Sequence, residues 1–89
     1  MADLVAGLSL YEFTSCPYCA RVRKFIAEQG LEIELRDVSR DRDRLEELVA
    51  ATGRQMVPCL RIEGEDGDVQ WMHESVDIIE YLRGRLAAD

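Results

Sequence analysis

The stretch that decides the fold is residues 8–19, which read Leu8-Ser9-Leu10-Tyr11-Glu12-Phe13-Thr14-Ser15-Cys16-Pro17-Tyr18-Cys19. Residues 8–13 are short and rich in apolar side chains, which is typical of a buried β-strand. From Pro17 the apolar positions follow helical spacing; proline suits the first turn of a helix, and Gly30 suits the position just past its end. Cys16 is therefore predicted at or beside a helix N-terminus.

Downstream of this junction, a second strand and a second helix are predicted. Residues 31–38 alternate between apolar and charged side chains, which indicates a strand that we expect at the edge of a sheet. Residues 39–43 contain side chains that can cap a helix, and the apolar positions beyond them predict about three helical turns that end before Gly53. The charges near this helix start are expected to be solvated surface.

The last third of the chain predicts a β-hairpin followed by a helix. Residues 57–62 form a strand that begins beside a proline, residues 63–68 are turn-forming, and residues 69–72 form the returning strand. From Glu74 the apolar spacing predicts an amphipathic helix that Ser75 or His73 could cap. We expect Gly84 to weaken its last turns.

Taken in order, these elements are βαβαββα. This order places the first two strands in parallel with a right-handed helical crossover, and the terminal hairpin completes a four-stranded mixed sheet with helices on both faces. That arrangement is an α/β fold of the thioredoxin-like type, in which a Cys-x-x-Cys after the first strand is a redox motif. With 89 residues, we expect residues 1–89 to form a single domain.

The charge balance excludes several classes of function. Asp and Glu number 18 against 11 Lys and Arg, for a net charge of −7, which argues against nucleic acid as a partner. No apolar run approaches the roughly 20 residues that span a bilayer, so no membrane partner is expected. The first residues lack the features of a signal peptide. We expect a cytoplasmic monomer in a reducing compartment.

The Cys16–Cys19 pair carries the predicted chemistry. A thiolate is the nucleophile in disulfide exchange, and the N–H groups and dipole at a helix N-terminus favour a negative sulfur at Cys16. Cys19 lies one turn further, shielded on the inner side. We therefore predict that Cys16 attacks a target disulfide and that Cys19 resolves the mixed disulfide. The basic residues Arg21, Arg23 and Lys24 are expected to add to the acidity of Cys16.

Two other interpretations of the cysteines are open. The pair could be structural, or Cys16 and Cys19 could join Cys59 and His73 in a zinc site. No second Cys-x-x-Cys is present to complete such a site, so no metal is expected. Cys59 is expected to be a buried small hydrophobe rather than a redox partner. His73 is expected to cap a helix or face solvent rather than tune the site.

The sequence resembles a known family at three places: residues 14–21 around Cys16-Pro17-Tyr18-Cys19, the segment Met56-Val57-Pro58, and residues 72–82. It is similar to the dithiol glutaredoxins, and residues 72–82 also resemble the glutathione-binding domain of glutathione transferases. The resemblance implies a glutathione site. In it, Pro58 is cis, the Val57 backbone pairs with glutathione like an added strand, and Tyr18 lines the groove.

The same resemblance implies further contacts with glutathione. Glu74 and Ser75 match positions that bind the γ-glutamyl end, where helix N–H groups and a hydroxyl suit its carboxylate. Met56 replaces the threonine that is usual before Val57. Phe13 stands where many members carry Lys or Arg, so Arg21 or another arginine is left to hold the glycyl carboxylate.

As a whole, the resemblance implies a glutathione-dependent thiol–disulfide oxidoreductase. It reduces protein disulfides and glutathione mixed disulfides, with Cys16 as nucleophile, Cys19 as resolving cysteine, and glutathione as co-substrate. Its expected partners are disulfide-bonded or glutathionylated proteins. Two alternatives stay open. One is an iron–sulfur cluster carrier with glutathione ligands, and the other is a glutathione-dependent transferase or thiol-binding module.

Overall fold

The computed structural model describes residues 4–64 and 66–88. Its elements follow the predicted βαβαββα order. They are β1 (Leu4–Glu12), α1 (Pro17–Glu28), β2 (Glu32–Asp37), α2 (Arg42–Thr52), β3 (Cys59–Glu63), β4 (Val69–Met72) and α3 (Ser75–Ala88). Within these residues, none of the helices has the length and apolar content needed to cross a bilayer.

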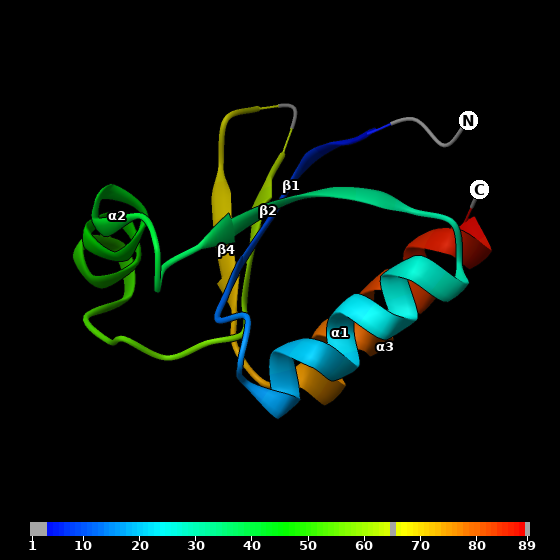
Figure 1. Ribbon diagram of the computed structural model, residues 1–89. Coiled ribbons are helices and arrows are strands. Elements are labelled where there is room, and N and C mark those ends of the chain that lie inside the picture. Colours follow the sequence, from blue (N-terminus) through cyan, green and yellow to red (C-terminus); the bar gives the residue numbers. More distant parts are fainter. Residues whose placement is uncertain (1–3, 65, 89) are drawn as a thin grey trace.

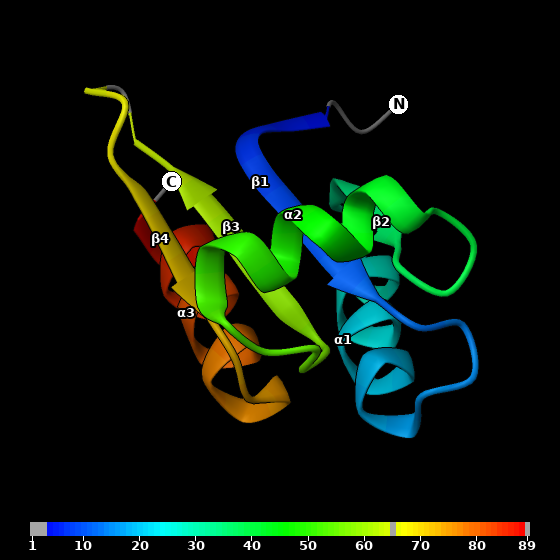
Figure 2. The same ribbon diagram turned by 90° about the vertical axis from the view of Figure 1, so that its left-hand side faces the viewer.

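The strands form one mixed sheet in the order β2-β1-β3-β4. β1 pairs with β2 in parallel, and β3 runs antiparallel to both β1 and β4. Helices α1 and α3 lie together on one face of the sheet, and α2 lies alone on the other (Figures 1 and 2). The predicted thioredoxin-like architecture, the edge position of β2 and the terminal hairpin are confirmed.

Local signals in the sequence set the helix bounds. Pro17 occupies the first turn of α1, and Gly30 lies just past its end with φ 67°. The Asp41 side chain caps α2 by accepting a hydrogen bond from the Asp43 N–H at 3.0 Å, and Gly53 ends that helix in the left-handed region with φ 74°. Gly84 does not end α3, which continues to Ala88.

Three strand starts differ from prediction, and that of β2 differs by one residue, since it begins at Glu32. β1 begins at Leu4 instead of Leu8. Between Leu4 and Ser9 the pairing register of β1 against β2 shifts, and Gly7, with φ 81°, lies in this interval. This irregularity interrupts the apolar pattern on which the prediction rested. β3 begins at Cys59, which pairs with Tyr11, because the preceding Pro58 has no N–H to donate to a ladder.

Alternation along β1 divides the core into two layers. Leu8 and Leu10 face the side of α1 and α3, where they join a buried cluster with Val22, Ile78 and other apolar residues. Tyr11 faces the opposite side and packs with residues of α2 and β3; that cluster is Tyr11, Val38, Leu48 and Cys59. The sheet is thus held from both faces, and its β1 end is fixed where the two cysteines follow.

Candidate functional site

Three segments of the chain meet at one end of the sheet: the start of α1, the loop before β3, and the start of α3 (Figures 1 and 2). Between them lies a groove of about 410 Å³. Its lining is Tyr18, Arg21, Met56, Val57, Pro58, Glu74, Ser75 and Val76. Every residue predicted to contact glutathione is therefore brought to one groove, although these residues are far apart in sequence.

Cys16 is the N-cap residue of α1 and is partly exposed. Its own N–H donates to the Phe13 carbonyl at 3.3 Å, and its carbonyl accepts from the Ala20 N–H at 3.0 Å. Partial burial would by itself raise the pKa of the Cys16 thiol. The backbone N–H and thiol of Cys19, the backbone N–H of Tyr18 and the charge of Arg23 outweigh it, so this pKa lies below the ordinary value.

Cys19 has the opposite character. It is 0% exposed, and its sulfur accepts a hydrogen bond from the Phe13 N–H at 3.4 Å. Burial is the main cause that raises the pKa of Cys19 to about 12, and the nearby Cys16 and Glu12 contribute in the same direction. The partly exposed thiol is thus the acidic one, and the inner thiol stays protonated.

The far side of the groove is formed by the Val57-Pro58 step and the start of α3. The Val57–Pro58 peptide bond is cis, as the resemblance implied. Glu74 is exposed and has φ 64°, in the left-handed region that side-chain-bearing residues seldom adopt. Ser75 is buried and is the first residue of α3, where backbone N–H groups have no partner within the helix.

The sequence did not predict the contacts by which Arg23 holds the loop before Cys16. Arg23 lies one turn after Cys19 and pairs with the buried Glu12 carboxylate at 3.1 Å. The same guanidinium donates to the carbonyls of Phe13 and Thr14 at 3.2 and 3.1 Å. One signal was available: strand alternation places Glu12 on the same face as Leu8 and Leu10, which predicts burial of its carboxylate.

Cys59 packs in the buried cluster on the α2 side of the sheet, with Tyr11, Val38 and Leu48. Cys59 is 0% exposed, which confirms the prediction of a buried small hydrophobe, and burial raises its pKa to about 11. Its sulfur lies 4.0 Å from Nε2 of the half-buried His73. Among the residues the structure describes, no three or more Cys, His, Asp or Glu side chains form a metal-binding group, so the zinc interpretation gains no support.

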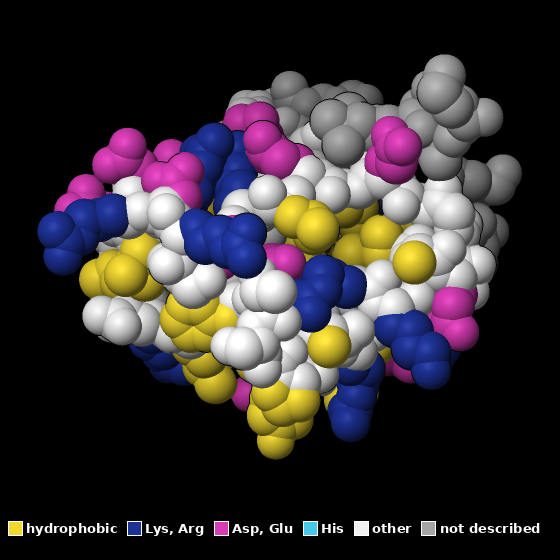
Figure 3. Space-filling view, viewed as in Figure 1, with side chains coloured by type: hydrophobic (Ala, Val, Ile, Leu, Met, Phe, Trp, Pro, Cys, Tyr) yellow, Lys and Arg dark blue, Asp and Glu magenta, His cyan; other side chains and the backbone are white. Residues whose placement is uncertain are grey.

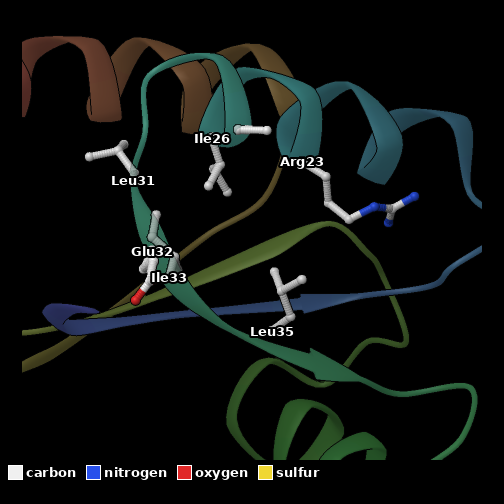
Figure 4. A pocket seen from close by; sticks show the side chains of 7 residues that line it. Arg23, Ile26, Leu31, Glu32, Ile33 and Leu35 are labelled. Carbon is white, nitrogen blue, oxygen red and sulfur yellow. The ribbon is translucent and has the colours of Figure 1, made fainter. Parts of the chain in front are cut away.

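A second hollow, of about 390 Å³, lies between α1 and β2, and neither Cys16 nor Cys19 lines it (Figure 4). Apolar side chains show at the surface in this region, and charges of both signs surround them (Figure 3). The Arg23 stem lies at one end of this hollow, while its guanidinium points away from Ile26 and Leu31. Arg23 therefore turns its charged end away from the apolar residues of this hollow.

The fold and the site together define a thioredoxin-like domain with a Cys-x-x-Cys pair at the start of α1. Residues 10–88 match the family model for the glutathione S-transferase N-terminal domain. A rice protein named glutaredoxin-C4, chloroplastic (Oryza sativa subsp. japonica), is 33% identical over 90 residues, covering 90% of this chain and 67% of the rice protein.

Two solved structures with bound glutathione are also similar. One is a maleylacetoacetate isomerase from Anaeromyxobacter dehalogenans, with 34% identity, a TM-score of 0.66, and coverage of 88% of this chain and 37% of that one. The other is glutaredoxin 2 from Salmonella typhimurium, with 25% identity, a TM-score of 0.67, and coverage of 90% and 33%. The chain thus spans only about a third of each.

These matches cover most of the chain and agree with its fold. The chain therefore belongs to the glutaredoxin family and carries features of the glutathione S-transferase N-terminal domain. It is a member of a family of glutathione-dependent enzymes.

Proposed function

We propose that this protein is a glutathione-dependent thiol–disulfide oxidoreductase that reduces glutathione mixed disulfides and protein disulfides. The observation that carries the proposal is the contrast between the two thiols. Cys16 is partly exposed with a lowered pKa, whereas Cys19 is buried with a raised one. This contrast suits Cys16 as the attacking thiolate and Cys19 as the resolving thiol.

Reduction of a glutathionylated protein needs only Cys16. The Cys16 thiolate attacks the glutathione sulfur, a new sulfur–sulfur bond forms, and the protein thiolate leaves and takes up a proton. A second glutathione, as thiolate, then attacks the glutathione sulfur of this mixed disulfide. Oxidised glutathione departs and the Cys16 thiolate is regenerated. The net exchange consumes one free glutathione thiol, and the other half of the oxidised glutathione is the glutathionyl group that was removed from the protein.

Reduction of a protein disulfide uses both cysteines. Cys16 attacks one sulfur of the target, forming a mixed disulfide and releasing the other target sulfur as a thiolate. Cys19 then loses its proton and attacks the Cys16 sulfur, so the second target thiolate leaves and a Cys16–Cys19 disulfide remains. Glutathione reduces that disulfide in two further exchanges. The burial of Cys19 keeps it protonated until a mixed disulfide is present.

The groove beside Tyr18 is the proposed glutathione site. The Val57 backbone is available to pair with the cysteinyl part of glutathione, while Ser75 and the first N–H groups of α3 suit the γ-glutamyl carboxylate. Glu74 suits the ammonium group. Arg21 lines the same groove and supplies the positive charge for the glycyl carboxylate that Phe13 lacks. The glutathione-bound relatives support this assignment.

The test compares wild type, Cys16→Ser and Cys19→Ser in two assays, with Cys59→Ser as the matched control. One assay follows turnover of a small glutathione mixed disulfide, and the other follows reduction of an intramolecular protein disulfide. Cys16→Ser should lose both activities, Cys19→Ser should lose only the second, and the control should keep both. Loss of mixed-disulfide turnover in Cys19→Ser would contradict the assigned roles.

A second candidate is a glutathione transferase-type reaction, which the matched family model and the isomerase relative favour. In that case the groove holds glutathione and its own thiol attacks an electrophile. Conjugation of glutathione to an aryl halide separates the two. Conjugation that persists in a Cys16→Ser, Cys19→Ser double variant, without disulfide turnover by wild type, would favour this candidate.

A further inference from the structure

The peptide of Phe13 is where both active-site cysteines and Arg23 meet. Its N–H donates to the Cys19 sulfur at 3.4 Å, and its carbonyl accepts from the Cys16 N–H at 3.3 Å. The same carbonyl accepts from the Arg23 guanidinium at 3.2 Å. Any group that positions Arg23 therefore positions both thiols.

Glu12 is that group. Its side chain is 6% exposed and pairs with Arg23 at 3.1 Å, and it precedes Phe13 in the chain. Only one carboxylate oxygen is used: no donor among the described residues reaches Oε2 of Glu12. A buried carboxylate with an unsatisfied oxygen is destabilising, so its place beside the two thiols calls for an explanation.

We propose, on the basis of the proposed thiol–disulfide function, that Glu12 is a positioning residue. It holds Arg23 against the loop before Cys16 and offsets part of the positive charge that Arg23 presents to the Cys16 sulfur. The charged and titratable groups that act on Cys16 are Cys19 and Arg23, both from α1. Those that act on Cys19 are Cys16 and, from β1, Glu12. Glu12 therefore tunes the contrast between the two thiols.

The two members of the ion pair should then have opposite effects. Glu12→Gln keeps an oxygen for Arg23 to bind but removes the negative charge, so the pKa of Cys16 should fall by about 0.5–1 unit. Arg23→Gln removes the positive charge, so the pKa of Cys16 should rise by a similar amount. Arg23→Lys keeps the charge and should stay near wild type.

The experiment measures the rate of iodoacetamide alkylation of Cys16 against pH on the reduced chain, with the site located by peptide mass spectrometry. Glutathione is absent, so the measurement reports on Glu12 even if wild type turns over no mixed disulfide. The matched controls are Glu80→Gln and Arg83→Gln, which break an exposed Arg–Glu pair on α3 with a 2.8 Å contact. These controls should not move the pKa of Cys16.

A purely structural role for the Glu12–Arg23 pair makes a different prediction. Either substitution would loosen the same loop, so Glu12→Gln and Arg23→Gln would shift the pKa of Cys16 in the same direction. That result, or shifts no larger than those of the controls, would overturn the proposal. If Arg23→Gln does not fold, the Glu12→Gln, Arg23→Gln double variant replaces it. The proposal is then overturned if the pKa of Cys16 in Glu12→Gln is not lower than in the double variant.

Discussion

The Phe13 N–H donates to the sulfur of the buried Cys19 at 3.4 Å, so the first residue after β1 contacts the inner thiol. Phe13 itself has no charge. The positive charge that lowers the pKa of Cys16 comes from Arg23 on α1. The reactivity of the cysteines is therefore set from α1 and β1 together.

The three thiols should label in a fixed order. At neutral pH, N-ethylmaleimide should modify Cys16 first, because thiolate is the reactive form and the pKa of Cys16 is lowered. Cys19 and Cys59, with pKa values of about 12 and about 11, should react at least about 100-fold more slowly. Peptide mass spectrometry over time measures this order. Equal labelling of Cys16 and Cys59 in folded protein would refute it.

The buried Cys59 thiol should make the protein less stable in alkali. The pKa of Cys59 is about 11 in the folded chain and about 8.5 in the unfolded chain. Its contribution to the free energy of unfolding is therefore fully present below about pH 8.5 and is lost as the pH rises toward 11. In that window the free energy of unfolding should fall by up to about 1.4 kcal/mol per pH unit from this group. Urea unfolding with reductant present measures the slope.

The matched variant for this measurement is Cys59→Ala. It should lower the free energy of unfolding at neutral pH because it leaves a cavity in the core, but it should flatten the alkaline slope. A slope unchanged from wild type would show that Cys59 ionises equally in both states.

Glu74 should show a conflict between stability and binding. Its φ of 64° is unfavourable for any residue with a side chain, so Glu74→Gly should keep or raise the free energy of unfolding, by up to about 1 kcal/mol. The same variant removes the proposed partner of the glutathione ammonium, so the KM for glutathione should rise about 10-fold. Glu74→Gln separates the two effects, since it loses the charge and keeps the strain. Glutathione binding equal to wild type in both variants would remove Glu74 from the site.

Gly7 and Gly84 should respond oppositely to alanine. A Cβ at Gly7 would lie 2.5 Å from the Glu63 carbonyl oxygen, and its φ is 81°, so Gly7→Ala should cost about 1–3 kcal/mol in unfolding free energy. A Cβ at Gly84 meets nothing within 4 Å among the described residues, and Gly84→Ala should stabilise α3 by about 0.5–1 kcal/mol. Urea unfolding midpoints measure both. A neutral Gly7→Ala would mean that the strand start adapts.

Most of the fold could be predicted from the sequence because its signals are local. The helical spacing after Pro17, the cap at Asp41 and the glycines at 30 and 53 all act within a few residues of their own position. The start of β1 escaped prediction because its irregular pairing at Gly7 depends on the neighbouring strand, which the alternation of side chains does not record.

The site was predictable in part, and for a different reason. The cysteines follow from their place at a strand-to-helix junction, and the groove residues from family resemblance; glutathione contact at those residues stays a prediction. The Glu12–Arg23 pair arises only when α1 packs against β1, and the approach of His73 to Cys59 depends on the register of β3 against β4, in which Leu60 pairs with Met72. Neither contact produces a periodic pattern of residues in the sequence.

Helix α2 differs from the other helices in how it is held. It lies alone on its face of the sheet, Leu48 is its one fully buried side chain, and Glu47 ties it to the sheet through the Tyr11 hydroxyl at 3.1 Å. The buried cluster on the α2 side has four members, whereas the one on the side of α1 and α3 has nine. Amide hydrogens of α2 should therefore exchange with deuterated solvent by local opening, ahead of those of α1, which stays packed on the sheet.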